Sequence, residues 1–149
     1  DENLEDLIAG NIQPEIQLDI IEAIENQEDK TLSTKLASYQ NAKPKDDPIA
    51  LYREALFGGN AQKGRQLFSE HEAAQCTRCH RIWEWGGDAG PSLMGVGNRL
   101  SKEALLLSMV DPSAEYSSGY AVAMIELKNG ESTAGIVQEE TDRKFHATF

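Results

Sequence analysis

The two cysteines of this 149-residue chain constrain its fold more than any other feature, because they stand three positions apart and a histidine follows the second. The run is Cys76-Thr77-Arg78-Cys79-His80. Two thiols at this spacing reach the two vinyl groups of one porphyrin, and the next residue turns its imidazole toward the iron. This pattern is typical of a c-type haem attachment site. We therefore expect one covalent haem c, held by Cys76, Cys79 and His80.

Three other interpretations of the motif compete with haem. A thioredoxin-like redox pair needs a strand-helix-strand context, and the flanking sequence offers none. A zinc site needs a fourth ligand from His71 or His146, but zinc modules usually show a second pair of ligands. A plain disulfide is sterically possible, yet it leaves His80 unexplained.

Charge divides the chain into two parts. The net charge is −11, which argues against nucleic acid as a partner. Residues 1–29 hold ten acidic residues and no basic one, whereas the remaining 120 residues carry 14 basic and 15 acidic residues. We interpret residues 1–47 as an acidic helical extension with its linker, and residues 48–149 as a second unit. The first residues lack a basic leader segment, so we expect a mature chain or a fragment.

Helical periodicity dominates the first unit. Pro14 suits a first helical turn, and isoleucines follow it at helical spacing. A second amphipathic stretch runs from Leu32 to Tyr39. We expect that two or three such helices cannot enclose a core alone. Two prolines and four charges between residues 42 and 48 then predict the linker.

The second unit changes from helical to strand patterning along its length. Helices are expected over residues 49–57, after Asn60 and from Ser101 to Val110, with a glycine-rich loop over residues 86–97. Alternation begins near Tyr120, and a hairpin turn over residues 128–131 precedes strands at 133–138 and 145–149. The longest apolar run, residues 120–125, is far below the roughly 18 residues of a membrane span. We expect a mainly α fold: a helical core over about 58–118 and a small antiparallel β meander over about 119–149.

The residues around the motif resemble a known family. They are Gly64-Arg65-Gln66-Leu67-Phe68, Gly90-Pro91-Ser92-Leu93, Gly95-Val96-Gly97-Asn98-Arg99, Leu105 to Ser113 and Gly119-Tyr120. Together with the haem motif they resemble a class I c-type cytochrome. They are most similar to the C-terminal haem-binding domains of planctomycete-type multidomain proteins, in which a dehydrogenase-like propeller and helical repeats often precede the cytochrome. The resemblance covers residues 58–141 and implies a cytochrome c-like helical haem domain.

The resemblance also implies roles for single residues. Cys76 and Cys79 would form the thioethers, and His80 would be the proximal iron ligand. Pro91 would hold His80 from behind through its own or a neighbour's backbone carbonyl. The remaining assignments are Leu93 packing on the haem face, Arg99 approaching a propionate, Phe68 packing in the helix crossing, and Trp83 or Trp85 lining the haem pocket. For Arg99 a surface charge is the alternative.

The sixth iron ligand is open at this stage. Met124 is the candidate within the chain, with core packing as its alternative role; Met109 is better explained as core, and the reach of Met94 is short. His71 and His146 are weaker candidates. The related domains place a Met-Pro loop and a last helix after such strands, so we expect a chain that is truncated at Phe149.

The resulting functional expectation is electron transfer without substrate chemistry. The partner would be a redox protein or an upstream dehydrogenase domain, and attachment of haem c implies a periplasmic or other extracytoplasmic location. Two alternatives remain: a haem enzyme or gas sensor with an open distal site, and a zinc-stapled interaction module. The acidic residues 1–29 form either a solvated face or a surface that steers a basic partner.

Overall fold

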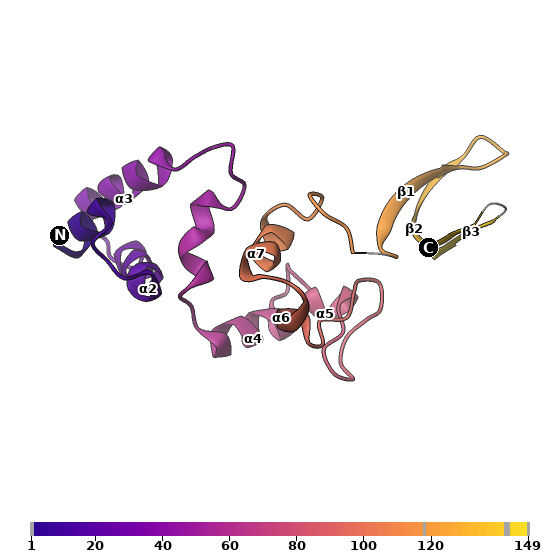
Figure 1. Ribbon diagram of the computed structural model, residues 1–149, viewed down its shortest axis with the longest axis horizontal. Helices are drawn as coiled ribbons and strands as arrows, with labels where there is room; N and C mark the ends of the chain where they lie inside the picture. Colours follow the sequence, from indigo (N-terminus) through magenta and orange to yellow (C-terminus); the bar gives the residue numbers. More distant parts are fainter. Residues whose placement is uncertain (1, 118, 142–143, 149) are drawn as a thin grey trace.

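Helices form the first three quarters of the chain, and a small sheet follows them (Figure 1). In this computed structural model the described residues are 2–117, 119–141 and 144–148, with side chains described up to Ile136. The helices are α1 (Glu2–Ala9), α2 (Pro14–Glu25), α3 (Lys30–Ala42), the 3-10 helix η1 (Ala50–Leu56), α4 (Ala61–Glu70), α5 (Cys76–Cys79), α6 (Val96–Arg99) and α7 (Lys102–Val110). The strands are β1 (Ala121–Glu126), β2 (Ser132–Thr141) and β3 (Lys144–Thr148).

The first three helices enclose a small core of their own. Its buried members are three pairs, one from each helix: Leu4 and Leu7, Ile21 and Ile24, Leu32 and Leu36. Our expectation that such helices cannot enclose a core was therefore wrong. Each helix is amphipathic, and three apolar stripes that face one axis exclude water where two would not. Pro14 occupies the first turn of α2, as predicted.

A buried polar cluster joins this helical unit to η1. Glu54 of η1 is buried, and it accepts hydrogen bonds from the Tyr39 hydroxyl at 2.8 Å and from Lys43 Nζ at 2.6 Å. Lys43 also lies 5.0 Å from the centroid of the Tyr39 ring. The cluster spans the proline-containing linker, because Tyr39 and Lys43 belong to α3 and its C-terminal cap. It therefore ties the acidic extension to the start of the second unit.

Local capping signals fix the helices of the second unit. The Asn60 side chain accepts hydrogen bonds from the backbone N–H groups of Gln62 and Lys63, and the Ser101 hydroxyl accepts one from Ala104. Both caps were predicted from the sequence.

The packing of side chains in this unit differs from that of α1–α3. Of the described residues between 57 and 136, the only buried ones are Gly90 and Gly135, so this stretch contributes no apolar side chain to a closed core.

The strands form an antiparallel sheet in the order β1-β2-β3. Val122 lies opposite Ile136 and Met124 opposite Ala134. The β1–β2 turn is closed by one hydrogen bond from the Leu127 N–H to the Glu131 carbonyl and one from the Gly130 N–H to the Leu127 carbonyl. Figure 1 shows the sheet projecting away from the helices. The expected mainly helical architecture with a small antiparallel sheet is confirmed. No helix in the described part of the chain is long and apolar enough to cross a membrane.

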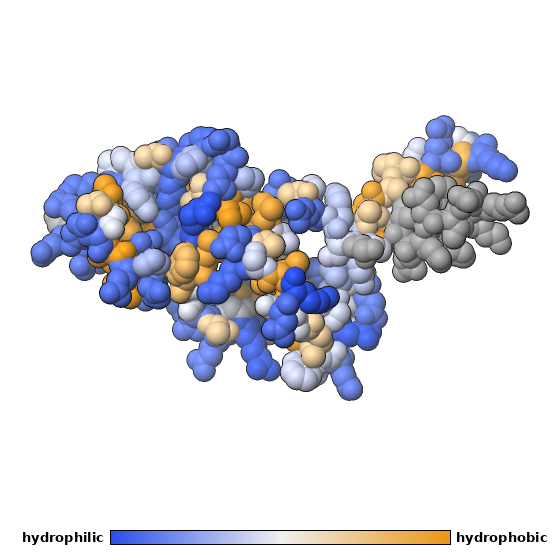
Figure 2. Space-filling model, viewed as in Figure 1, coloured by the Kyte–Doolittle hydropathy of each residue, from blue (hydrophilic) through white to orange (hydrophobic). Residues whose placement is uncertain are grey.

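Hydrophobic residues are not confined to the interior of the helical part. Figure 2 shows them at the surface over the middle of the molecule, among polar residues. Leu67, Trp83 and Trp85 are among the exposed ones. These three residues belong to the same stretch of chain that lacks a buried apolar core.

Candidate haem site

The cysteine-histidine motif forms a single helical turn. Helix α5 spans the two cysteines, and His80 ends it by donating its backbone N–H to the Cys76 carbonyl at 2.9 Å. Cys76 is half-buried, Cys79 is exposed, and both are free thiols. A spacing of three residues places two side chains on neighbouring positions of one helical face. Both cysteines therefore lie on one side of α5, and of the two only Cys79 lines the cavity of His80 described below.

The imidazole of His80 is held by the loop that follows. Its Nδ1 lies 2.9 Å from the Pro91 carbonyl oxygen. A carbonyl oxygen only accepts hydrogen bonds, so Nδ1 carries the proton and Nε2 presents its lone pair. This is the arrangement of a metal-ligating histidine, in which a carbonyl partner fixes the tautomer and strengthens the ligand. The hydrogen bond is the one expected for Pro91.

Glycine is required where this loop approaches the motif. A Cβ added to Gly90 would lie 2.8 Å from His80 Cε1, and one added to Gly86 would lie 2.1 Å from the His80 carbonyl oxygen. Gly86 also has a φ of +103°, which other residues rarely adopt. Backbone hydrogen bonds from Gly90 to Cys79 and from Leu93 to Arg81, each 2.8 Å, fasten the loop to α5. The backbone thus packs directly against the imidazole.

His80 lines a cavity of about 400 Å³ between α5, the loop and α7. That volume lies within the range of small-molecule and cofactor sites. Most of its lining is apolar or aromatic, and the last two residues come from the sheet. The lining includes Cys79, His80, Pro91, Leu93, Val96, Arg99, Leu100, Leu105, Ser108, Pro112, Glu115, Tyr116, Tyr120, Val122 and Ile136. Five of the predicted haem-site residues, Cys79, His80, Pro91, Leu93 and Arg99, therefore meet at one cavity.

Arg99 is the cation among these lining residues. Its Nη2 donates to the Ser92 carbonyl at 2.7 Å and to the Met94 carbonyl at 3.3 Å. These bonds orient the guanidinium at the cavity without neutralising its charge. A guanidinium retains further N–H donors in this arrangement, and it suits a carboxylate. The site thus offers a cationic position next to an apolar cavity.

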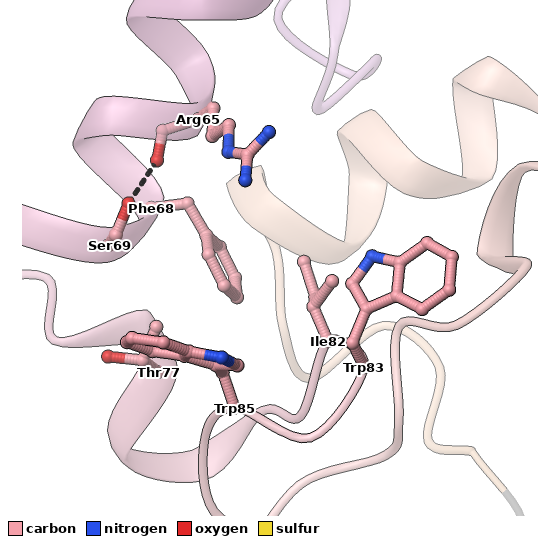
Figure 3. Close-up of a pocket in the computed structure, with 7 residues that line it drawn as sticks. All are labelled: Arg65, Phe68, Ser69, Thr77, Ile82, Trp83 and Trp85. Atoms are coloured by element: carbon pink, nitrogen blue, oxygen red, sulfur yellow. Dashed lines mark hydrogen bonds between the residues drawn. The ribbon is translucent and has the colours of Figure 1, made fainter.

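Trp83 and Trp85 lie at a different hollow (Figure 3). This second hollow, of about 490 Å³, is lined by Arg65, Phe68, Ser69, Thr77, Ile82, Trp83 and Trp85. Figure 3 shows Phe68 pointing toward Trp85, while the Trp83 ring turns outward. The reason is a tight turn: Ile82 and Trp85 exchange backbone hydrogen bonds, and Trp83 adopts a φ of +58°. The structure thus places neither tryptophan at the cavity of His80.

The three methionines do not line the cavity of His80 either. Met94 is 40 %, Met124 73 % and Met109 81 % exposed. Core packing, the role expected for Met109 and the alternative for Met124, is therefore wrong. Leu105 and Ser108 of α7 line the cavity, whereas Met109, one turn after Leu105, lies beyond its edge and is exposed. Met124 as the sixth ligand stays a prediction.

Of the two histidines proposed as further ligands, His71 is the one whose side chain is described. The Nδ1 of His71 accepts a hydrogen bond from the backbone of Ala74, and the side chain of His146 lies outside the described residues. Within the described part of the chain, no three His, Cys, Asp or Glu side chains come together as a metal site.

Sequence reasoning missed several residues of the cavity wall. Leu105 and Tyr120 were noticed only as parts of a resemblance, whereas Tyr116, Val122 and Ile136 were not assigned to a site at all. One local signal was available. The alternation of β1 predicts that Val122 and Met124 share one face of the sheet, but nothing local indicates that this face borders the cavity.

No protein-family model, curated protein or solved structure was found to match this chain.

Proposed function

We propose that this chain is a single-haem c-type cytochrome domain that transfers electrons. The observation that carries the proposal is the His80–Pro91 hydrogen bond, because it leaves the Nε2 lone pair for a metal in a side chain that lines a cavity together with the free thiol Cys79. The residues fit haem c: Cys76 and Cys79 would form thioethers, His80 would ligate the iron, and Leu93 would pack on the macrocycle. When bound, haem c supplies an iron that alternates between the ferric and ferrous states.

The chain's own residues would set the conditions of that electron transfer. The Pro91 carbonyl increases the electron donation of the imidazole by accepting a hydrogen bond from its Nδ1–H group, which favours the ferric state. The apolar wall favours the state of lower net charge. Arg99 provides a cation for a propionate at the edge of the cavity.

Location and partner follow from the same proposal. Covalent haem attachment takes place after export, so we propose a periplasmic or other extracytoplasmic location. The partner would be a redox protein or an upstream dehydrogenase domain. The acidic helices α1 and α2 offer a surface that would steer a basic partner.

A second candidate is a haem protein with an open distal position, such as a gas sensor. The exposure of all three methionines favours it, because the described cavity wall instead carries Ser108, Tyr116 and Tyr120. Hydroxyl groups at such a wall suit a small bound ligand more than a sixth protein ligand.

Carbon monoxide distinguishes the two candidates. We expect the ferrous chain, purified with its haem attached, to show sharp low-spin bands that carbon monoxide leaves unchanged. That result supports a carrier with a bound sixth ligand. The Met124→Leu variant then assigns the ligand: a new carbon monoxide complex in this variant alone identifies Met124, and Met109→Leu is the matched control. A high-spin ferrous wild type that binds carbon monoxide contradicts the carrier and supports the open site.

A further inference from the structure

One face of the β1–β2 sheet is apolar and has no partner among the described side chains. Residues opposite one another in an antiparallel pair share a face, so Val122 and Ile136 lie on the same face as Met124 and Ala134. Val122 is 60 % and Met124 73 % exposed. The other face is better covered, because Ala123, Ile125 and Thr133 are half-buried. Both faces therefore carry apolar side chains, and the face of Val122 and Met124 is the less covered of the two.

This apolar face is continuous with the cavity of His80. Val122 and Ile136, the pair at the end nearest the helices, line the cavity together with His80, Leu93 and Tyr120. Met124 and Ala134 lie two residues further out, roughly 7 Å along the strands. The face thus begins at the cavity and continues beyond it.

We propose that the apolar face formed by Val122, Met124, Ala134 and Ile136 is a wall of the haem site and packs on the bound macrocycle. This inference rests on the proposed function and adds to it a role for the sheet. A haem plane is broad and apolar, and a pleated surface with two β-branched side chains offers a matching flat contact.

The cavity residues explain why haem, rather than another chain, is the occupant. The face meets the cavity at the same place as Leu93, in the loop before α6, and Tyr120, directly before β1, and both are half-buried. Figure 1 shows the sheet attached to the helices at this end only. A group bound between His80 and the sheet would contact both parts, and it would order the sheet against the helices.

Two adjacent positions on opposite faces test the proposal. Val122→Asp places a carboxylate on the proposed wall, and Ala121→Asp places the same group on the other face of the same strand. Both positions are exposed, so both variants should fold like the wild type when no haem is attached. Circular dichroism of the haem-free proteins checks this.

Hydrogen exchange of the strand amides is the first measurement. We expect haem attachment to slow exchange in β1 and β2 at least tenfold in the wild type and in Ala121→Asp. In Val122→Asp that protection should be lost while the haem stays covalently attached. The midpoint potential should fall in Val122→Asp alone, because a carboxylate beside the haem stabilises the ferric state.

Each contrary result has a distinct meaning. A wild type that attaches no haem refutes the proposed function itself. Attached haem with unchanged strand exchange, or two variants that behave alike, refutes the wall while leaving the cytochrome intact. Sedimentation checks for a dimer. If the strands of the wild type are protected only in a dimer, and Val122→Asp loses both dimer and protection, the proposal is also overturned, because the apolar face then packs against a second copy of the chain.

Discussion

At the scale of single residues, the position of the His80 ring is set by backbone atoms. The backbone N–H of His80 bonds to the last turn of α5, and the ring Nδ1 donates to the Pro91 carbonyl. The backbone of Gly90 lies against the ring. Backbone contacts are less adaptable than side-chain contacts, because they cannot change rotamer. The imidazole is therefore oriented by the loop before any ligand binds to Nε2.

Gly90→Ala tests this orientation. The added Cβ would lie 2.8 Å from His80 Cε1, so the ring must move, at a cost of about 1–3 kcal/mol in the free energy of unfolding. We expect the variant to keep its covalent haem, because both cysteines remain, but to become high-spin and bind carbon monoxide in the ferrous state. Gly97→Ala is the matched control, since nothing lies within 4 Å of its added Cβ. Identical spectra of the two variants would contradict this account of His80.

At the scale of elements, the buried Glu54 links α3 to η1. Burial alone would raise the pKa of Glu54, but the hydrogen bonds from Lys43 and Tyr39 and the charge of Lys43 outweigh it and hold that pKa below its usual value. A buried ion pair adds little stability over an apolar contact, yet removal of one partner is costly. The cluster therefore specifies how the extension docks onto η1.

Acid should weaken this link. Because the pKa of Glu54 is lowered in the folded state, its contribution is present above the unfolded value of about 4.5 and is lost as the pH falls further. Glu54→Gln should cost about 3 kcal/mol at pH 7, and the difference from the wild type should shrink below pH 4.5. Urea unfolding at several pH values measures it. Glu5→Gln, which removes an exposed pair with Lys35, should cost about 0.5 kcal/mol. Equal costs for the two variants would refute the assignment.

Alkali should act through the other member of the cluster. Burial, together with the hydrogen bond and charge of Glu54, raises the pKa of Tyr39 to about 12. Because the pKa of Tyr39 is raised in the folded state, the contribution of this group to the free energy of unfolding is fully present below pH 10 and is lost between pH 10 and about 12. Tyr39→Phe should lack that loss, whereas Tyr52→Phe at an exposed position should retain it. A Tyr39→Phe variant with the same alkaline slope as the wild type would contradict the cluster.

At the scale of the whole molecule, the chain contains two differently packed parts. Helices α1–α3 carry a closed apolar core, whereas the described stretch from 57 to 136 surrounds a cavity and buries no large apolar side chain. Charge and the two prolines at positions 44 and 48 predicted a boundary between residues 47 and 48, and that boundary stays a prediction. The sequence also predicted the caps at Asn60 and Ser101, since such signals are local.

Features that depend on distant contacts could not be predicted in the same way. The bond between Tyr39 and Glu54 joins two elements whose packing angle no local pattern fixes. The outward turn of Trp83 arises from a positive φ that its residue type disfavours. The motif itself predicted the roles of Cys76, Cys79 and His80 because its chemistry requires one spacing, whereas the cavity wall is assembled from several elements.

Covalent attachment of haem is the most direct test of the central proposal. The chain would be produced in the periplasm of a bacterium that attaches haem c, extracted with acidified acetone, and examined by absorption in denaturant. We predict haem bands that remain with the wild-type polypeptide and disappear from it in a Cys76→Ser, Cys79→Ser double variant. A wild-type chain without haem bands, from cells that attach haem to a control cytochrome, would contradict the account.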